Sequence, residues 1–252
     1  MKQLTPPHQV NEYQYTGKII GKGLFGTVAL YKNKYQDLVV IKFEHCMLGN
    51  AMLQESINLR NLKKLIQSRD LQEEISIPNG LSFYQIVGMM FKSIKQLHDL
   101  GYLHRNIHPD NFRVQNNKIY LIAFGSSIKY IDEHNQHIPE QRNKKLVGIH
   151  DVASIFTQQG IEPSRRDDYI SAAYSLLLLR HEHLPWQKEN QEQLHQLQIQ
   201  TMIDDKLKIM YQSPYNNIED KAIISILNYL HCLEFEDEPE IEEIQSLFCY
   251  LQ

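Results

Sequence analysis

The chain has 252 residues, a formal net charge of -4 and 42% hydrophobic residues, which is the balance of an ordinary folded domain. The charge argues against a nucleic-acid partner, and no apolar run approaches the roughly 18 residues that a membrane helix needs. The three cysteines, Cys46, Cys232 and Cys249, are odd in number and lack metal-ligand spacing, so we expect an intracellular, cytoplasmic protein without a metal site.

The first third of the chain predicts a small sheet followed by a helix. Residues 1–14 form a polar leader, residues 15–31 predict two strands around a glycine turn, and the β-branched run 38–43 predicts a third strand. Apolar residues then recur at helical spacing, namely Leu53, Ile57, Leu62, Leu65 and Ile66.

The rest of the chain is predicted to be mainly helical. Residues 82–100 form an amphipathic pattern that ends at Gly101, with Ile86, Met89, Met90, Ile94 and Leu97 on its apolar side. A short strand is expected over 118–122 and irregular structure over 126–166. Further helices are expected over 168–180, 188–198, 219–232 and 239–250. Strands first and helices afterwards indicate an α+β fold with segregated lobes.

A glycine-rich segment, Gly21-Lys22-Gly23-Leu24-Phe25-Gly26-Thr27-Val28, lies between the first two strands. Its spacing matches G-x-G-x-x-G-x-V, in which glycines let the backbone approach phosphate groups and present amide donors. The conserved positions of that motif fall on Gly21, Gly23, Gly26 and Val28. A tight β-turn without a ligand is the alternative interpretation.

Lys42 ends the strand Val39-Val40-Ile41-Lys42, 16 positions after Gly26. In the matching V-A-I-K strand the lysine contacts nucleotide phosphates and pairs with a glutamate of the next helix, which here is Glu55. A surface lysine at a strand end is the alternative interpretation.

The stretch His104-Arg105-Asn106-Ile107-His108-Pro109-Asp110-Asn111-Phe112, followed by residues 121–125, has the frame of a protein-kinase catalytic loop and metal-binding loop. Asn106 stands where an aspartate would accept the substrate hydroxyl proton, and Ala123 stands where an aspartate would hold magnesium. An amide is a very poor base and a methyl group cannot ligate a cation. Asn111 matches the second metal ligand, but the frame lacks both carboxylates.

Tracts of the second half extend the likeness. They are His137–Pro139 with Arg142–Lys144, Ala153–Ile155, Gly160–Asp168, Leu184–Gln187 and Phe235–Pro239. With them the chain resembles the casein kinase 1 family of Ser/Thr protein kinases over about residues 13–251. The resemblance implies a kinase-like domain over 15–251, with a shortened N-lobe of reduced sheet (about 15–70) and a helical C-lobe (about 71–251).

The resemblance also assigns roles to single residues. Asp168 resembles the kinase aspartate that hydrogen-bonds the catalytic-loop backbone, with an ordinary helix N-cap as the alternative. His108 replaces the lysine that resembles a transition-state charge stabiliser. Asp151 replaces an arginine that helps the family hold an anion, so recognition of pre-phosphorylated substrates should be lost. Asp110 matches a variable acidic position and is not expected to act as a base.

The distance along the chain from Glu55 to Asn106 is short. It is 51 positions, whereas the family needs roughly 75, so about 25 residues are missing. Residues 70–74 then look like a linker helix joined almost directly to the preceding helix. We therefore expect the fourth and fifth N-lobe strands and the adenine-contacting hinge to be absent, and the third strand to be an edge.

These features predict a catalytically inactive pseudokinase that acts as a scaffold or structural protein, with a role in cytoskeletal or ciliary assemblies as one option. No cofactor is expected. A partner protein is expected to dock on the shortened N-lobe, at Leu59, Leu62, Leu65 and Ile66. Two alternatives remain: a sensor that binds ATP through the glycine segment, Lys42 and Asn111, and a residually active Ser/Thr kinase.

Overall fold

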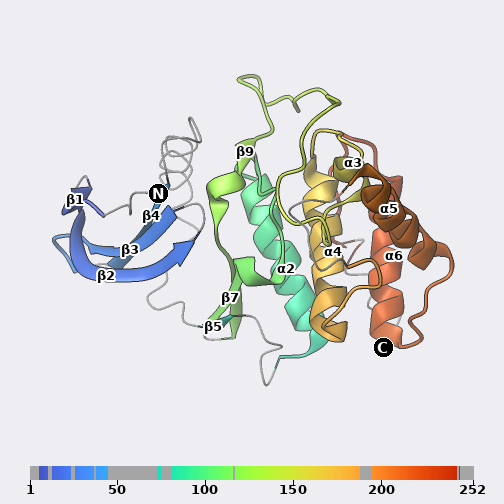
Figure 1. Ribbon diagram of the computed structural model, residues 1–252, viewed down its shortest axis with the longest axis horizontal. Coiled ribbons are helices and arrows are strands. Elements are labelled where there is room, and N and C mark those ends of the chain that lie inside the picture. The colour runs from blue at the N-terminus through green and yellow to red at the C-terminus, as the bar shows by residue number, and fades with distance from the viewer. Residues whose placement is uncertain are drawn as a thin grey trace. The chain divides into compact units, whose positions relative to one another are not determined.

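The computed structural model describes residues 6–10, 13–23, 26–36, 38–44, 73–74, 81–115, 117–187, 195–242 and 244. Two predictions lie outside the described residues: the helix with Glu55, and the docking residues Leu59, Leu62, Leu65 and Ile66. The chain divides into two compact units (Figure 1). The first comprises Met1–Lys63 with Gln67–Arg69, and the second Lys64–Ile66 with Asp70–Gln252. Each unit is described by itself.

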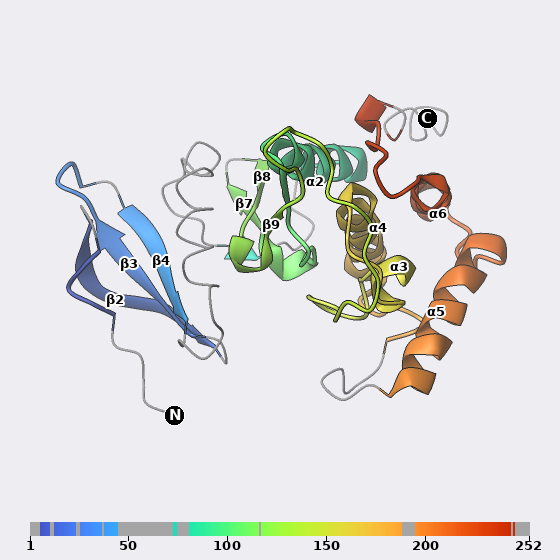
Figure 2. The same cartoon turned by 90° about the horizontal axis from the view of Figure 1, so that it is seen from above.

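The first unit contains an antiparallel sheet in the order β1-β2-β3-β4; Figure 2 labels its strands β2, β3 and β4. Its strands are β1 (Gln9–Val10), β2 (Tyr13–Gly23), β3 (Gly26–Lys32) and β4 (Leu38–Glu44). The three predicted strands are therefore confirmed, and β4 is the last strand of the sheet in the part of the chain that the structure describes. The predicted leader over 1–14 is wrong at residues 9–10 and 13–14, because β1 and the start of β2 pair there. Ala29 and Tyr31 are fully buried, with Val10, Tyr13 and Tyr15 packed against them.

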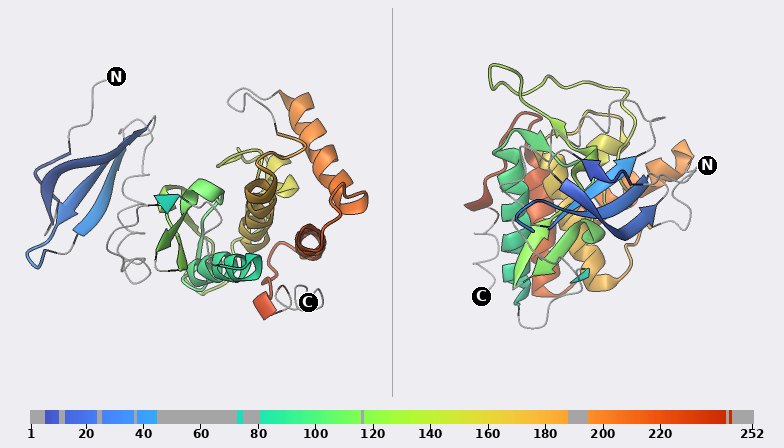
Figure 3. Two further views of the ribbon diagram at one scale, coloured as in Figure 1. Left: turned by 90° about the horizontal axis from the view of Figure 1, so that it is seen from below. Right: turned by 90° about the vertical axis from the view of Figure 1, so that its left-hand side faces the viewer.

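The second unit is mainly helical, with five α-helices among its described residues (Figure 3). They are α2 (Phe83–His98), α3 (Ile155–Gln158), α4 (Arg165–His181), α5 (Gln196–Tyr211) and α6 (Ile218–Cys232). The long helix α4 packs against α2 and α6, and α5 packs against α6. This mixture of small sheets and helices agrees with the predicted α+β class.

Helix α2 forms where the sequence predicts it. Ser82 accepts a hydrogen bond from the Gln85 amide while the Gln85 side chain accepts one from Ser82, which is a capping box. Gly101 follows the helix at φ +82°, where a side chain would collide with Ile131. The buried face carries Ile86, Val87, Met90, Phe91, Ile94, Leu97 and His98.

Two small sheets accompany the helices. One has the order β5-β7-β8, and the other pairs β6 with β9. The bounds are β5 (Glu73–Glu74), β6 (Tyr102–Leu103), β7 (Phe112–Gln115), β8 (Lys118–Leu121) and β9 (Ile128–Lys129). Strand β8 confirms the strand expected over 118–122. Of the linker helix expected over 70–74, residues 70–72 lie outside the described residues. Strand β5 contradicts the helix at Glu73 and Glu74, because pairing with Val114 and Arg113 holds these two residues extended.

Two predicted helices differ from the structure. Helix α4 begins at Arg165, three residues before the predicted start. Of the helix predicted over 188–198, residues 188–194 lie outside the described residues; helix α5 begins at Gln196 and runs to Tyr211, beyond the predicted end. Its buried residues are Met202, Ile203, Lys206 and Ile209, and the buried lysine obscures the apolar pattern. The helix expected over 239–250 lies largely outside the described residues, although Ile241, Glu242 and Ile244 are helical.

Candidate functional site

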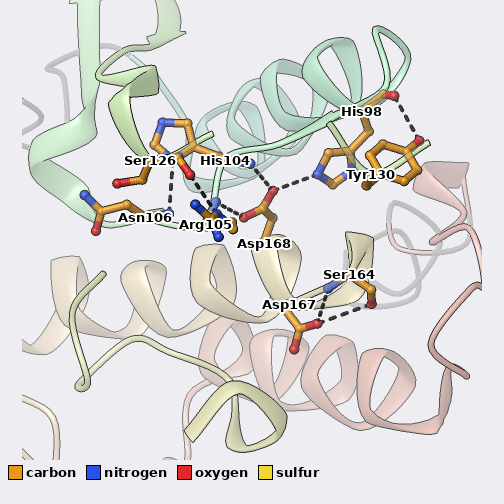
Figure 4. A network of polar contacts seen from close by, with 9 residues as sticks. All are labelled: His98, His104, Arg105, Asn106, Ser126, Tyr130, Ser164, Asp167 and Asp168. Atoms are coloured by element: carbon orange, nitrogen blue, oxygen red, sulfur yellow. Dashed lines mark hydrogen bonds and ion pairs between the residues drawn. The ribbon is translucent and has the colours of Figure 1, made fainter. Parts of the chain in front are cut away.

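Asp168, in the first turns of α4, holds the backbone of the 104–112 loop (Figure 4). Its Oδ2 accepts a hydrogen bond from the His104 amide at 2.7 Å, and its Oδ1 accepts one from the Arg105 amide at 2.8 Å. His98 Nε2 donates to Oδ2 at 2.9 Å. The predicted contact between Asp168 and the loop backbone is thus confirmed.

The N-cap interpretation of Asp168 is wrong. Ser164 caps α4, and the Asp167 carboxylate accepts hydrogen bonds from the Ser164 amide at 2.7 Å and from the Ser154 hydroxyl. Burial alone would raise the pKa of Asp168, but the hydrogen bond and charge of His98 hold that pKa below its ordinary value. Burial raises the pKa of Asp167. The Asp168 carboxyl group therefore loses its proton more readily than the Asp167 carboxyl group.

His104 is fully buried, and its hydrogen bonds fix its protonation state. Its Nε2 lies 2.9 Å from the Ile122 carbonyl oxygen, so it must donate, and its Nδ1 accepts from the Asn106 amide at 3.3 Å. The ring is therefore neutral, and burial lowers its pKa. His104 joins the loop to the residue that precedes Ala123.

Asn106 stands at the position predicted for a catalytic base. Its side chain points away from Asp168 (Figure 4). Its Oδ1 is buried and accepts no hydrogen bond from the described residues. The buried Asn111 donates through Nδ2 to the Asn106 carbonyl oxygen at 2.7 Å. The structure therefore brings Asn106 and Asn111 together, and Asn111 supports the loop.

His108 and Asp110 lie two positions apart in the same loop. His108 Nδ1 is 3.6 Å from Asp110 Oδ2, and the Asp110 side chain is 74% exposed. Burial lowers the pKa of His108, and Arg113 lowers it further against the attraction of Asp110. His108 is therefore mostly uncharged at neutral pH and does not supply the positive charge of a lysine.

Ala123 has a left-handed backbone, with φ 64° and ψ 56°. An L-residue other than glycine loses roughly 1–2 kcal/mol in this region, and aspartate and asparagine occupy it several times more often than other side chains. The backbone at this position thus suits an aspartate better than the alanine that occupies it. The Ala123 side chain offers no atom that could bind a metal.

The glycine segment and Lys42 belong to the first unit. Gly21 lies opposite Val28 in the β2–β3 pair, and Val28 lies opposite Lys42 in the β3–β4 pair. Gly23 and Gly26 face each other where the hairpin closes. The backbone register therefore places these sequence-predicted residues in adjoining rows of one sheet. Glu55 lies outside the described residues.

Asp151 is buried, as is Lys206 of α5. The Lys206 ammonium donates to the carbonyl oxygens of His150 and Ala153 at 2.9 and 2.7 Å and to Gln158 Oε1 at 3.1 Å. Burial lowers the pKa of Lys206 well below its ordinary value, against the attraction of Asp151. Position 151, where the resemblance would place an anion-binding arginine, thus carries a buried acid whose charge attracts Lys206.

A cavity of about 180 Å³ adjoins the loop. Its walls come from residues 105–107, residues 144–153 and the region from Thr157 to Ser171, all within the second unit. The cavity and the loop form the candidate site.

Sequence reasoning missed His98 and Lys206. His98 lies 70 positions from Asp168, and Lys206 lies 53 positions from Ala153. A signal was present for His98, because it follows Ile94 and Leu97 on the apolar face of α2. A polar residue on such a face needs a buried partner.

No protein-family model matches this chain. Among the described residues, no helix is long and apolar enough to cross a membrane. The same residues contain no group of three or more histidine, cysteine, aspartate or glutamate side chains suited to a metal ion.

Proposed function

We propose that this chain is a catalytically inactive member of the casein kinase 1-like proteins, with a two-lobed kinase fold, that acts as an intracellular scaffold. The observation that carries the proposal is the 104–112 loop. Asp168 supports its backbone through two amide hydrogen bonds, while the side chains expected to perform phosphotransfer are the amide of Asn106 and the methyl group of Ala123.

The backbone at Ala123 supports the proposal independently. Its left-handed conformation favours an aspartate, so the loop retains a geometry that its present residue does not need. His108, whose pKa is lowered by burial, offers no stable positive charge for a transferring phosphoryl group. The base, the metal ligand and the cation each make a separate catalytic contribution, and the loss of all three would remove all of these contributions.

A nucleotide sensor is the second candidate. The observation that favours it is the row formed by Gly21, Val28 and Lys42 across β2, β3 and β4, where the glycine motif and the lysine adjoin. The short distance from Glu55 to Asn106 in the sequence argues against it, because the adenine-binding hinge would lie in the missing stretch.

A thermal-shift titration with ATP separates these candidates. We expect no change in melting temperature up to millimolar ATP, with or without magnesium, and no transfer of the γ-phosphate to a generic protein substrate. A magnesium-dependent rise in melting temperature would contradict the scaffold proposal and favour a sensor. The matched control is Lys42→Met: a true ATP-induced rise should disappear in this variant.

The scaffold proposal includes a protein partner on the shortened N-lobe, at Leu59, Leu62, Leu65 and Ile66, and a cytoskeletal or ciliary assembly is one setting for it. Strand β4, the last strand of the described sheet, borders this region in sequence. Strong hydrogen-exchange protection across residues 38–66 of the isolated chain would contradict docking here.

A further inference from the structure

The loop between α5 and α6 carries a Ser-Pro pair that the candidate site does not use. Its residues, Ser213 and Pro214, lie between Gln212, the C-cap of α5, and Asn217, the N-cap of α6. Ser213 is partly exposed and Pro214 is exposed. Among the described residues, no backbone-to-backbone hydrogen bond involves residues 213–216. Another protein can therefore reach the Ser213 hydroxyl group without the disruption of a helix or a strand.

A proline that directly follows a serine is a feature that an enzyme can recognise. Proline has no backbone N–H, and its ring fixes φ. It also favours an extended conformation at the preceding residue, which is the form in which many peptides lie along a binding groove. A groove without an acceptor at this position would leave the N–H of any other residue unsatisfied. A Ser-Pro pair therefore suits the substrate groove of a proline-directed Ser/Thr protein kinase.

The sequence contains two pairs of this kind, Thr5-Pro6 and Ser213-Pro214. The structure distinguishes them by the exposure of the proline: Pro6, of the first unit, is buried, whereas Pro214 is exposed. An enzyme that encloses the proline reaches Pro214 directly, but it would have to displace Pro6 from its packing. The sequence thus offers two candidate hydroxyl groups, and the structure favours that of Ser213.

The residue after the Ser-Pro pair is fixed to two helices. The Tyr215 ring stacks on the His181 ring of α4, with the ring centroids 4.5 Å apart. His181 Nε2 lies 3.0 Å from Asp220 Oδ2 of α6, and Arg180 Nε donates to Asp220 Oδ1 at 2.6 Å. The loop is therefore attached to α4 and α6 two positions after Ser213, and the Ser-Pro pair is presented from a fixed turn.

The same turn supplies a hydrogen-bond donor to the oxygen of Ser213. The Tyr215 amide donates to Ser213 Oγ at 3.1 Å. After phosphorylation, a phosphate oxygen can replace the hydroxyl oxygen as the acceptor, and a charge-assisted hydrogen bond is roughly twice as strong as a neutral one. The exposed Pro214 beside it leaves the phosphate in contact with water. The loop can therefore hold a phosphate group without unfolding.

We propose that Ser213 is a phosphorylation site for a proline-directed Ser/Thr protein kinase, and that the fold retains the phosphate. The Ser213 hydroxyl oxygen bonds to the γ-phosphorus of ATP, the bond from that phosphorus to the bridging oxygen breaks, the hydroxyl proton passes to the base of the kinase, and ADP leaves. ATP and the catalytic groups come from the second enzyme. The inference goes beyond the proposed scaffold function and does not depend on it.

Incubation of the folded full chain with magnesium, ATP and a purified proline-directed kinase tests the proposal. A mitogen-activated protein kinase and a cyclin-dependent kinase are the two enzymes used. Mass spectrometry of the intact chain counts the phosphate groups, and tandem mass spectrometry locates them. We expect one phosphate per chain, on Ser213, and none when the added kinase is left out.

Two variants and a matched control identify the site. Ser213→Ala should remove the phosphate. Pro214→Ala should lower the rate by roughly tenfold or more, because it restores an N–H while it leaves the hydroxyl group in place. The control is Ser225→Ala, since Ser225 is exposed on α6 but is followed by isoleucine, and it should leave the rate within about twofold. Circular dichroism checks the folding of each variant.

Two synthetic peptides, residues 1–12 and residues 207–219, separate the motif from the fold. Each contains one Ser/Thr-Pro pair, so both should accept phosphate. In the folded chain, the rate at Thr5 should be roughly tenfold or more below the rate in its peptide, because Pro6 must first leave its buried position. The rate at Ser213 should differ from that in its peptide by much less.

Three results would overturn the proposal: no phosphate on the folded chain, an unchanged amount of phosphate in Ser213→Ala, or a melting temperature of the phosphorylated chain more than about 5 °C below that of the unmodified chain. None of these results bears on the ATP titration, so the scaffold function could stand while this proposal fails. Phosphate gained on Ser213 without the added kinase would contradict both the inactivity of the chain and the need for a second enzyme.

Discussion

Asp168 is the residue on which the geometry of the loop depends most directly. Replacing it by asparagine leaves one oxygen for three donors, the amides of His104 and Arg105 and the ring of His98. Because unsatisfied buried donors cost roughly 1–3 kcal/mol each, we expect Asp168→Asn to lower the free energy of unfolding by about 3 kcal/mol. Urea denaturation measures it, with hydrogen exchange at the two amides.

The control is Asp110→Asn in the same loop. The Asp110 side chain is 74% exposed, and its distance of 3.6 Å from His108 gives a weak surface contact. This variant should therefore change the free energy of unfolding by less than about 0.5 kcal/mol. Equal losses in the two variants would show that Asp168 does not hold the loop.

The contributions of Asp167 and Asp168 to the free energy of unfolding should depend on pH in opposite ways. The folded pKa of Asp168 lies below its ordinary value of 3.8, so its contribution to stability is present above that pH and is lost as the pH falls through the folded pKa. The stability difference between wild type and Asp168→Asn should therefore shrink on acidification. Urea denaturation at pH 5, 4 and 3 measures this difference.

Asp167 should behave in the opposite way. Its folded pKa is raised above 3.8, so its contribution is complete at low pH and is lost as the pH rises through the folded value. The difference between wild type and Asp167→Asn should grow on acidification. The same trend in both variants would contradict the opposite directions of the pKa shifts of Asp168 and Asp167.

At the scale of single residues, the sequence predicts the chemistry of a side chain better than it predicts which residues surround that side chain. Asn106 and Ala123 could be named as unsuited to catalysis from their spacing alone, since an amide and a methyl group have fixed chemistry. The environments of His98 and Asp151 could not be predicted, because each depends on residues brought together from distant positions. The left-handed backbone of Ala123 likewise has no local signal in an alanine.

Among the elements, α5 depends on a buried lysine. Lys206 joins this helix to residues 150–158 through three acceptors. Lys206→Met leaves those acceptors and Asp151 without the ammonium group, so the free energy of unfolding should fall by about 3 kcal/mol. Lys208→Met, which replaces an exposed lysine on the same helix, should change it by less than about 0.5 kcal/mol.

Lys206 should also make stability rise with pH. Its folded pKa is lowered well below 10.5, so between the folded pKa and 10.5 the unfolded chain holds a proton that the folded chain has released. Above the folded pKa, stability should increase by at most about 1.4 kcal/mol per pH unit. Denaturation between pH 7 and 9.5 measures the slope, which Lys206→Met should remove. The upper limit of pH 9.5 lies below the ordinary tyrosine pKa of 10.0. Above that value Tyr169 and Tyr174 would ionise in the unfolded chain but not in the folded chain, where burial raises their pKa values. An unchanged slope in Lys206→Met would contradict this origin.

Element prediction succeeded where one periodicity dominates and failed where a tertiary contact decides. The apolar face and the cap signals of α2 are local, so its position was predicted closely. Strand β5 consists of two glutamates that helix propensity favours as helical, yet pairing with β7 makes them extended. The continuation of α5 to Tyr211 was not predicted, because its buried positions include Lys206.

At the scale of the whole molecule, the candidate loop and the cavity depend on one unit. The hydrogen bonds that hold the loop, among the described residues, come from α2, α4 and the residues around Ile122 and Ser126. All of them belong to the second unit. A chain of residues 70–252 should therefore fold alone, since a unit of this size buries enough surface for a stable core.

We expect this shorter chain to keep its helical circular dichroism, to unfold in one cooperative transition, and to protect the His104 and Arg105 amides from exchange as the full chain does. Asp168→Asn should remove that protection in both chains, because the donors and the acceptor lie in the same unit. A shorter chain that melts gradually, or that exchanges these two amides rapidly while keeping Asp168, would show that the first unit is required for the loop. In that case the glycine segment and the 104–112 loop would have to be treated as parts of one cooperative structure, and a partner that binds the first unit would act on the loop as well.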